Sequence, residues 1–321
     1  SEDRDSMSKI AFIYPGQGAQ KAGMGADFYE NSEIARYIFD QAGEELDLDM
    51  KELCFEENDR LDLTEYTQAA MVTTCLAMTR VAESKGLKAD ITAGLSLGEY
   101  PAIAAAGGMN DMDAIRLVRK RGILMQNTVP AGEGAMCAVI SMAAEEIEKV
   151  IEPIADVSVA NYNCPGQIVI TGKTDAVEEA AAKLKEAGAR RTIMLNVSGP
   201  FHSQMLVPAG EKLAEELEHT RFHELRIPYV TNVTAEKVTD IRETPGLLTT
   251  QISSPVRWMQ SMERMIADGV DTFVEIGPGK TLEGFLRKID RSVKVFHISQ
   301  WEDVDKVCTE LADSGKMMEE A

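Results

Sequence analysis

The sequence is short of basic residues and of long apolar segments. It holds 33 Lys and Arg against 53 Asp and Glu, which gives a formal net charge of −20. Such a charge argues against nucleic acid as a partner, because proteins bind the phosphate backbone largely through Lys and Arg. The chain has no run of 18 apolar residues, the length that a membrane-spanning helix needs. We therefore expect neither nucleic acid nor membrane among the partners.

Cysteine is also scarce. The five cysteines are Cys54, Cys75, Cys137, Cys164 and Cys308. Their spacing fits no metal-binding motif, and their number is odd, so we expect reduced thiols, a cytoplasmic location and no metal. Residues 1–6 are charged and lack the apolar centre of a signal peptide. We interpret them as an added leader, with Met7 as the natural start.

Short apolar segments alternate with helical patterns along most of the 321 residues. The hydrophobic content of 44% suffices for one large core and a smaller domain. The alternation predicts a parallel α/β sheet. The expected strands are residues 9–14, 89–93, 272–276 and 294–297, and the expected helices are residues 66–83, 99–106, 112–127, 204–217, 257–267 and 281–289.

Residues 134–195 follow a different order. Strands are expected at 135–140, 157–162, 167–171 and 192–195, and helices at 143–151 and 175–187. This order, βαββαβ, is the ferredoxin-like split motif. We therefore expect an α/β-hydrolase-like parallel-sheet domain, residues 7–131 and 199–308, with an inserted ferredoxin-like βαββαβ subdomain, residues 132–198. Residues 309–321 are expected to form an acidic C-terminal tail that frays.

A Gly-x-Ser-x-Gly pentapeptide, residues 94–98, lies between a predicted strand and a predicted helix. The glycines permit a sharp turn and leave room for a substrate. The N-terminus of the helix that follows favours negative charge near Ser96. Ser96 is therefore a candidate nucleophile, although the motif alone also fits a serine that caps a buried helix.

A nucleophilic serine needs a base within hydrogen-bond reach, and the sequence holds four histidines. His219 and His223 lie in a charged segment and are expected at the surface, whereas His297 ends a predicted strand and its role is open. His202 lies at the boundary of the two expected domains, just before a helix. The helix N-terminus would help to keep its ring neutral. We favour His202 as the base over a simple capping residue.

Arg121 is the one charged residue on an otherwise apolar helix face. The other members of that face are Ala114, Leu117, Val118, Leu124 and Met125. A buried guanidinium must be paired, because burying it alone is costly. Its partner is either a carboxylate of the protein or a substrate carboxylate held by two parallel hydrogen bonds.

The loop Gly16-Gln17-Gly18 follows the first predicted strand. Its glycines let backbone N–H groups approach a ligand closely. Such a loop beside a nucleophile turn can form half of an oxyanion hole, and the N–H of Leu97 would form the other half. The segment does not complete Gly-x-Gly-x-x-Gly, so it is no dinucleotide-binding motif.

From Lys9 to Ser299 the chain resembles the malonyl-CoA:acyl-carrier-protein transacylases of fatty acid synthesis, which are related to the acyltransferase domains of polyketide synthases. The resemblance lies in motifs that occur in the same order in that family. They are residues 14–20 (YPGQGAQ), Thr67-Gln68, 94–100 (GLSLGEY), Arg121-Gly122, Met125-Gln126, 161–163 (NYN), 165–167 (PGQ), 201–203 (FHS), 254–256 (SPV) and 275–279 (EIGPG).

The resemblance implies a role for each matching residue. Ser96 would carry the acyl group, His202 would be its base, and Arg121 would bind the malonyl carboxylate. The backbone amides of Gln17 and Leu97 would form the oxyanion hole. The remaining implied roles are orientation of the histidine by the backbone carbonyl of Gln251, in place of an aspartate, and substrate binding by Gln68, Asn163 and Phe201, where Phe201 is the malonyl-type choice.

One position departs from the family pattern, because Leu95 stands where a histidine usually precedes the serine. No polar role is therefore expected there, and His202 stays the candidate base. The implied reaction moves a malonyl group from malonyl-CoA to the phosphopantetheine thiol of acyl carrier protein through a malonyl-serine, with no cofactor and a monomeric enzyme. An acidic carrier would need a local basic patch, for which the candidates are Arg190, Arg191, Lys280, Arg287 and Lys288.

Three alternatives stay open on the sequence. A serine hydrolase would share the Gly-x-Ser-x-Gly motif, but it would not require Arg121 and would usually have an acid between serine and histidine. A non-catalytic module that binds carrier protein would keep the fold without the chemistry. A related transferase could serve a polyketide or polyunsaturated-lipid pathway.

Overall fold

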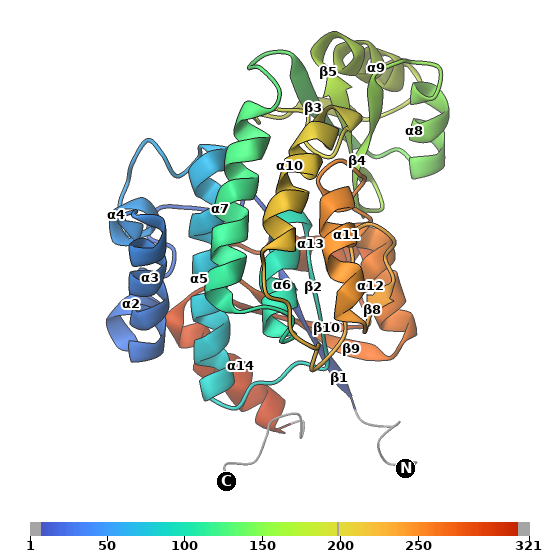
Figure 1. The fold of residues 1–321 in the computed structure, drawn as a ribbon. Coiled ribbons are helices and arrows are strands. Elements are labelled where there is room, and N and C mark those ends of the chain that lie inside the picture. The colour runs from blue at the N-terminus through green and yellow to red at the C-terminus, as the bar shows by residue number, and fades with distance from the viewer. Residues whose placement is uncertain (1–7, 198, 314–321) are drawn as a thin grey trace.

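The computed structural model describes residues 8–197 and 199–313. The expected leader, residues 1–6, and the end of the expected tail, residues 314–321, lie outside the described residues. The fold has a large sheet covered by helices and a small sheet at one end of it (Figure 1).

The large sheet has six strands in the order β10-β9-β1-β2-β7-β8. Their bounds are β1 (Lys9–Tyr14), β2 (Ile91–Gly94), β7 (Tyr229–Val230), β8 (Lys237–Val238), β9 (Val270–Ile276) and β10 (Lys294–Ile298). All neighbouring pairs are parallel except β7 with β8. The central strands are almost wholly buried, as expected of a parallel sheet with helices on both faces.

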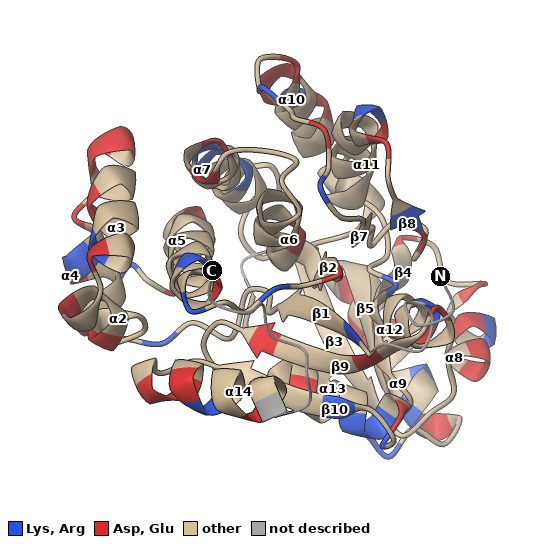
Figure 2. Ribbon diagram, turned by 90° about the horizontal axis from the view of Figure 1, so that it is seen from below, with Lys and Arg blue, Asp and Glu red and all other residues tan. Residues whose placement is uncertain are grey.

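Helices cover the two faces of this sheet (Figure 2). One apolar core includes side chains of α5 (Thr64–Ser84), α6 (Glu99–Ala105) and α7 (Asp111–Asn127). A separate core on the other face includes α12 (Trp258–Ala267) and α13 (Thr281–Ile289). The remaining helices of the large domain are α2 (Ala26–Asn31), α3 (Glu33–Leu46), α4 (Met50–Phe55), α10 (Val207–Glu218), α11 (Thr244–Gln251) and α14 (Trp301–Asp313).

The small sheet is antiparallel, in the order β4-β5-β3-β6. The small domain around this sheet comprises β3 (Gly134–Ile140), α8 (Ala144–Ile151), β4 (Val157–Cys164), β5 (Gln167–Lys173), α9 (Thr174–Glu186) and β6 (Arg191–Met194). This order confirms the predicted ferredoxin-like motif and the α/β fold class. The elements lie within the predicted range 132–198, whose exact limits stay a prediction. Backbone hydrogen bonds join β4 to the segment before α12, between Val256 and both Ala160 and Tyr162.

The largest difference from the expected fold lies at the two ends of the chain. Helices α2 to α4 were not predicted, and α14 continues to Asp313, past residue 308, where the predicted domain ended. The last helix is held because Val304, Val307 and Leu311 share one buried face. Within residues 8–197 and 199–313, no helix is both long and apolar enough to cross a bilayer.

Candidate active site

The nucleophile turn follows directly from the end of β2. Ser96 has a φ of 54°, in the left-handed region that non-glycine residues rarely adopt. The turn is tight, since a Cβ added at Gly94 would lie 1.8 Å from the carbonyl oxygen of Gly98. A Cβ at Gly98 would lie 2.3 Å from the carbonyl oxygen of Tyr14 on β1. Both flanking glycines are therefore needed for Ser96 to project from the sheet.

Two side chains brace this turn, those of Asn232 and Gln251, and neither of these bracing contacts was predicted from the sequence. The Asn232 Oδ1 accepts the Ser96 N–H at 2.7 Å, and the Asn232 Nδ2 donates to the Gly94 carbonyl at 2.7 Å. The Gln251 side chain donates to the Ser96 carbonyl at 2.8 Å. Asn232 follows β7, a strand of two residues, which is too short to show a periodic signal. The bracing is a tertiary effect and leaves no local motif in the sequence.

His202 contacts Ser96, as predicted. Its Nε2 lies 2.7 Å from the Ser96 Oγ, and its Nδ1 lies 2.9 Å from the Gln251 carbonyl oxygen. Because a carbonyl oxygen only accepts, Nδ1 carries the proton and Nε2 is free to accept one. Among the described residues no carboxylate bonds this ring, so the backbone carbonyl of Gln251 takes the place of the usual acid.

Burial, together with the positive charge of Arg121, lowers the pKa of His202 to about 4. The ring is therefore neutral near pH 7 and can accept the proton of Ser96. A neutral ring was expected for His202, with a helix N-terminus as a contributing cause. Burial is the largest cause of the low pKa and the charge of Arg121 the next, and a contribution from the helix N-terminus stays a prediction.

Arg121 lies on the buried face of α7, as the apolar pattern predicted, and is 0% exposed. Its guanidinium donates to the Gln68 Oε1 at 3.0 Å, the Gln251 Oε1 at 3.1 Å and the Ser96 Oγ at 3.3 Å. The ring of Tyr100 lies 5.6 Å from its Cζ. Over the described part of the chain no carboxylate lies within ion-pair distance of Arg121. The first of the two predicted partners, a carboxylate of the protein, is therefore absent.

A cavity of about 370 Å³ opens onto Ser96, His202 and Arg121 between the two sheets. The other predicted site residues that line it are Gln17, Gln68, Leu97, Asn163 and Phe201. The Oδ1 of Asn163 is buried without a hydrogen-bond partner among the described residues, so it is available to a ligand. Leu95 also lines the cavity and presents an apolar side chain there.

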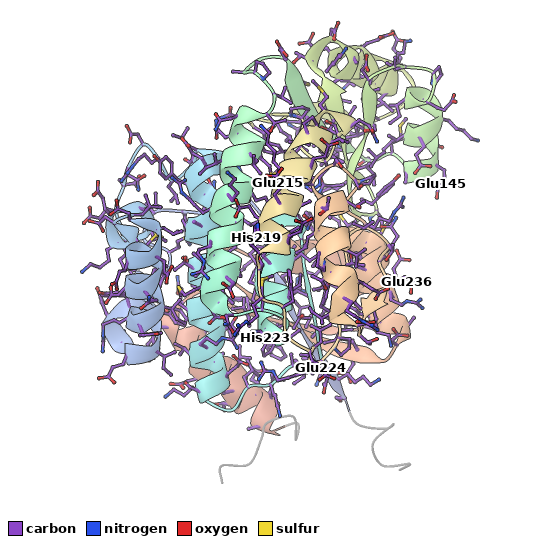
Figure 3. The ribbon with its side chains drawn as sticks, viewed as in Figure 1. Glu145, Glu215, His219, His223, Glu224 and Glu236 are labelled. Atoms are coloured by element: carbon purple, nitrogen blue, oxygen red, sulfur yellow. The ribbon has the colours of Figure 1, made fainter. Side chains whose placement is uncertain are left out.

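The other three histidines lie elsewhere. His219 ends α10 and His223 follows in the next loop, and both lie away from the small domain (Figure 3). His297 lies on β10, 3.5 Å from the Glu283 carboxylate. Where residues are described, no group of three or more His, Cys, Asp or Glu side chains could hold a metal ion.

The fold, the serine–histidine pair and the buried arginine are those of an acyltransferase. The chain belongs to the acyl transferase domain family, whose profile matches residues 11–304. It is similar to the malonyl CoA-acyl carrier protein transacylase of Bacillus subtilis, with 44% identity over 304 residues, 93% of this chain and 96% of that protein. The predicted family is thereby confirmed.

Solved structures give the same result. The malonyl CoA-acyl carrier protein transacylase of Clostridium perfringens superposes with a TM-score of 0.92 at 42% identity, covering 96% of this chain and 98% of that one. A malonyl-transacylase in complex with a type II PKS acyl-carrier protein superposes with a TM-score of 0.92 at 35% identity, covering 94% of this chain and 100% of that one.

Proposed function

We propose that this enzyme transfers the malonyl group of malonyl-CoA to the phosphopantetheine thiol of acyl carrier protein, in fatty acid biosynthesis. The observation that carries the proposal is the Arg121 guanidinium, which is fully buried, has no carboxylate partner among the described residues and lies 3.3 Å from the Ser96 Oγ. A buried cation at that position selects an acyl group that brings its own carboxylate.

In the first half-reaction the Ser96 Oγ attacks the thioester carbonyl of malonyl-CoA while its proton moves to the His202 Nε2. The resulting oxyanion would be bound by the backbone amides of Gln17 and Leu97. The carbon–sulfur bond then breaks, and the CoA sulfur takes the proton from His202. The products are malonyl-Ser96 and free CoA, and His202 is neutral again.

In the second half-reaction the phosphopantetheine thiol of the carrier protein enters the same cavity. Its proton moves to the His202 Nε2 as its sulfur attacks the malonyl ester. The ester bond breaks, the Ser96 oxygen recovers the proton, and the malonyl group leaves on the carrier. Gln68, Asn163 and Phe201 would shape the acyl-binding part of the cavity during both steps.

The reaction needs no group beyond the residues named and the CoA thioester, which is a substrate, so we propose that no cofactor takes part. We also propose that the enzyme works as a monomer in the cytoplasm. A hydrolase is less well supported, because an acyl-enzyme that water cleaves would not require a buried arginine beside the nucleophile. The Gln251 carbonyl also stands where hydrolases usually present an acid.

Intact-mass spectrometry after mixing with malonyl-CoA tests this proposal. The wild-type chain should gain one malonyl group, and Ser96→Ala should gain none, because the nucleophilic oxygen is absent. An adduct of equal yield on Ser96→Ala would place the acyl group elsewhere and contradict the assignment. Ser84→Ala, which removes a serine hydroxyl at the end of α5, is the matched control and should be labelled normally.

A further inference from the structure

Glu99 is an ionisable side chain beside the site to which the proposed mechanism gives no role. Glu99 is the first residue of α6, directly after the nucleophile turn, and is 0% exposed. Its Oε1 accepts the backbone N–H of Asn232 at 2.6 Å. Its Oε2 is buried and has no hydrogen-bond partner in the described residues. One oxygen is therefore fixed, and the other is open to a proton.

Glu99 belongs to a cluster of unsatisfied polar atoms. The Arg121 Nε and the Tyr100 hydroxyl are also buried without partners within the described ranges. The charges of Glu99 and Arg121 act on each other, since Arg121 lowers the pKa of Glu99 and Glu99 raises that of Arg121. The two groups form no direct ion pair in the described residues, so the guanidinium stays free to bind a ligand, and Glu99 balances its charge when it is ionised.

We propose that an ionised Glu99 balances the charge of Arg121 in the free enzyme and binds a proton when the carboxylate of an acyl group reaches Arg121. The incoming carboxylate supplies the negative charge that Glu99 otherwise provides. Two buried carboxylates beside one guanidinium would leave an uncompensated negative charge, which a low-dielectric site disfavours. The inference rests on the proposed function, because it takes malonyl as the acyl group.

The surroundings of Glu99 favour this behaviour. Burial raises the pKa of Glu99 to about 8, although the Asn232 N–H, Arg121 and Gln251 lower it. The titratable groups that face it are Arg121 from α7, Tyr229 from β7 and Tyr100 on its own helix. Burial raises the pKa of both tyrosines, so they stay neutral. Arg121 is thus the charge to which Glu99 responds.

The sign of the effect with pH follows from these groups. Well below pH 8, Glu99 is protonated with or without the acyl group, and loading takes up no proton. Above pH 8 it is ionised in the free enzyme, and malonyl on Arg121 raises its pKa, so loading takes up a proton. Arg121 also lowers the pKa of His202, but that pKa starts near 4 and does not reach this range.

A pH-indicator measurement during a single round of loading tests the proposal. At about pH 8.5 the wild type should take up more protons per malonyl group than Glu99→Gln, by up to about one, and at about pH 6.5 the difference should vanish. The released CoA thiol ionises equally in both enzymes and cancels. The glutamine variant keeps the acceptor for the Asn232 N–H. Intact mass, measured in parallel, counts the malonyl groups.

Acetyl loading of the wild type gives a second measurement that needs no variant. Acetyl-CoA releases the same thiol but brings no carboxylate, so its loading should lack the extra uptake. Equal proton exchange for malonyl and acetyl at about pH 8.5 would overturn the role of Glu99 while the adduct still formed. Absence of the malonyl adduct itself would instead refute the proposed function.

Discussion

At the scale of single residues, the identity of the substrate depends on Arg121. Its guanidinium is held by the amide oxygens of Gln68 and Gln251, which fix its position without neutralising it. A malonyl carboxylate can accept two parallel hydrogen bonds from such a fork, whereas an acetyl group leaves the buried cation unpaired. We therefore expect selectivity to depend on one side chain and the two amides that orient it.

Replacing Arg121 should remove this selectivity. In Arg121→Ala the ratio of malonyl to acetyl kcat/KM should fall by about 10²-fold or more, because a hydrogen bond to a charged group contributes a few kcal/mol. Arg121→Lys keeps the charge but loses the fork, so malonyl transfer should drop substantially. Both rates must be measured on folded protein. An equal fall for malonyl and acetyl would make Arg121 a structural residue and refute its role in selectivity.

At the scale of elements, the site depends on how β7 lies beside β2. The pairing of Ala93 with Val230 brings Asn232 level with the nucleophile turn, where its side chain continues the hydrogen bonding beyond the last strand residues. A turn with Ser96 at a φ of 54° needs such support, because a left-handed serine is strained.

Removing the Asn232 side chain should lower the rate of malonyl loading while the protein still folds. Asn232→Ala should slow malonyl loading at saturating malonyl-CoA by at least about tenfold, because a small displacement of a nucleophile has a large effect on rate. Asn58→Ala is the matched control, since Asn58 also bridges backbone groups, in a loop that does not line the cavity. Both variants should lose about 1–3 kcal/mol of stability. Equal loading rates in the two would show that Asn232 acts on stability alone.

The elements also explain what could be predicted from the sequence. The strand β1 is a continuous apolar segment after Lys9, and Arg121 interrupts an apolar helix face, so both gave local signals. The strand β7 has two residues and gave none, and Asn232 was missed with it. Helices α2 to α4 and α14 were missed as well, although α14 presents its own buried face. Contacts made by short or late elements depend on the assembled sheet.

At the scale of the whole molecule, the acidic excess is unevenly distributed. Figure 2 shows Asp and Glu along α2, α3 and α14, and Lys and Arg around β10. Arg287 pairs with Glu283 at 2.7 Å. The charge of Lys288 acts on Cys164 of β4, which places it beside the small domain. Docking of an acidic carrier at this side, near the α13 residues that line the cavity, stays a prediction.

The cavity between the two sheets must serve both half-reactions, since one serine receives the malonyl group and gives it up. A hydrolase with the same serine would lose the group to water. A binding module with the same fold would never acquire it. A transferase, a hydrolase and a binding module therefore differ in the fate of the malonyl group at Ser96.

The most direct measurement isolates the malonyl-enzyme, mixes it with holo acyl carrier protein and follows both proteins by intact mass. The account predicts that the malonyl group leaves the enzyme and appears on the carrier thiol in equal amount, much faster than it is lost without the carrier. Loss as free malonate at the same rate with and without carrier, or an adduct that persists on Ser96, would contradict it.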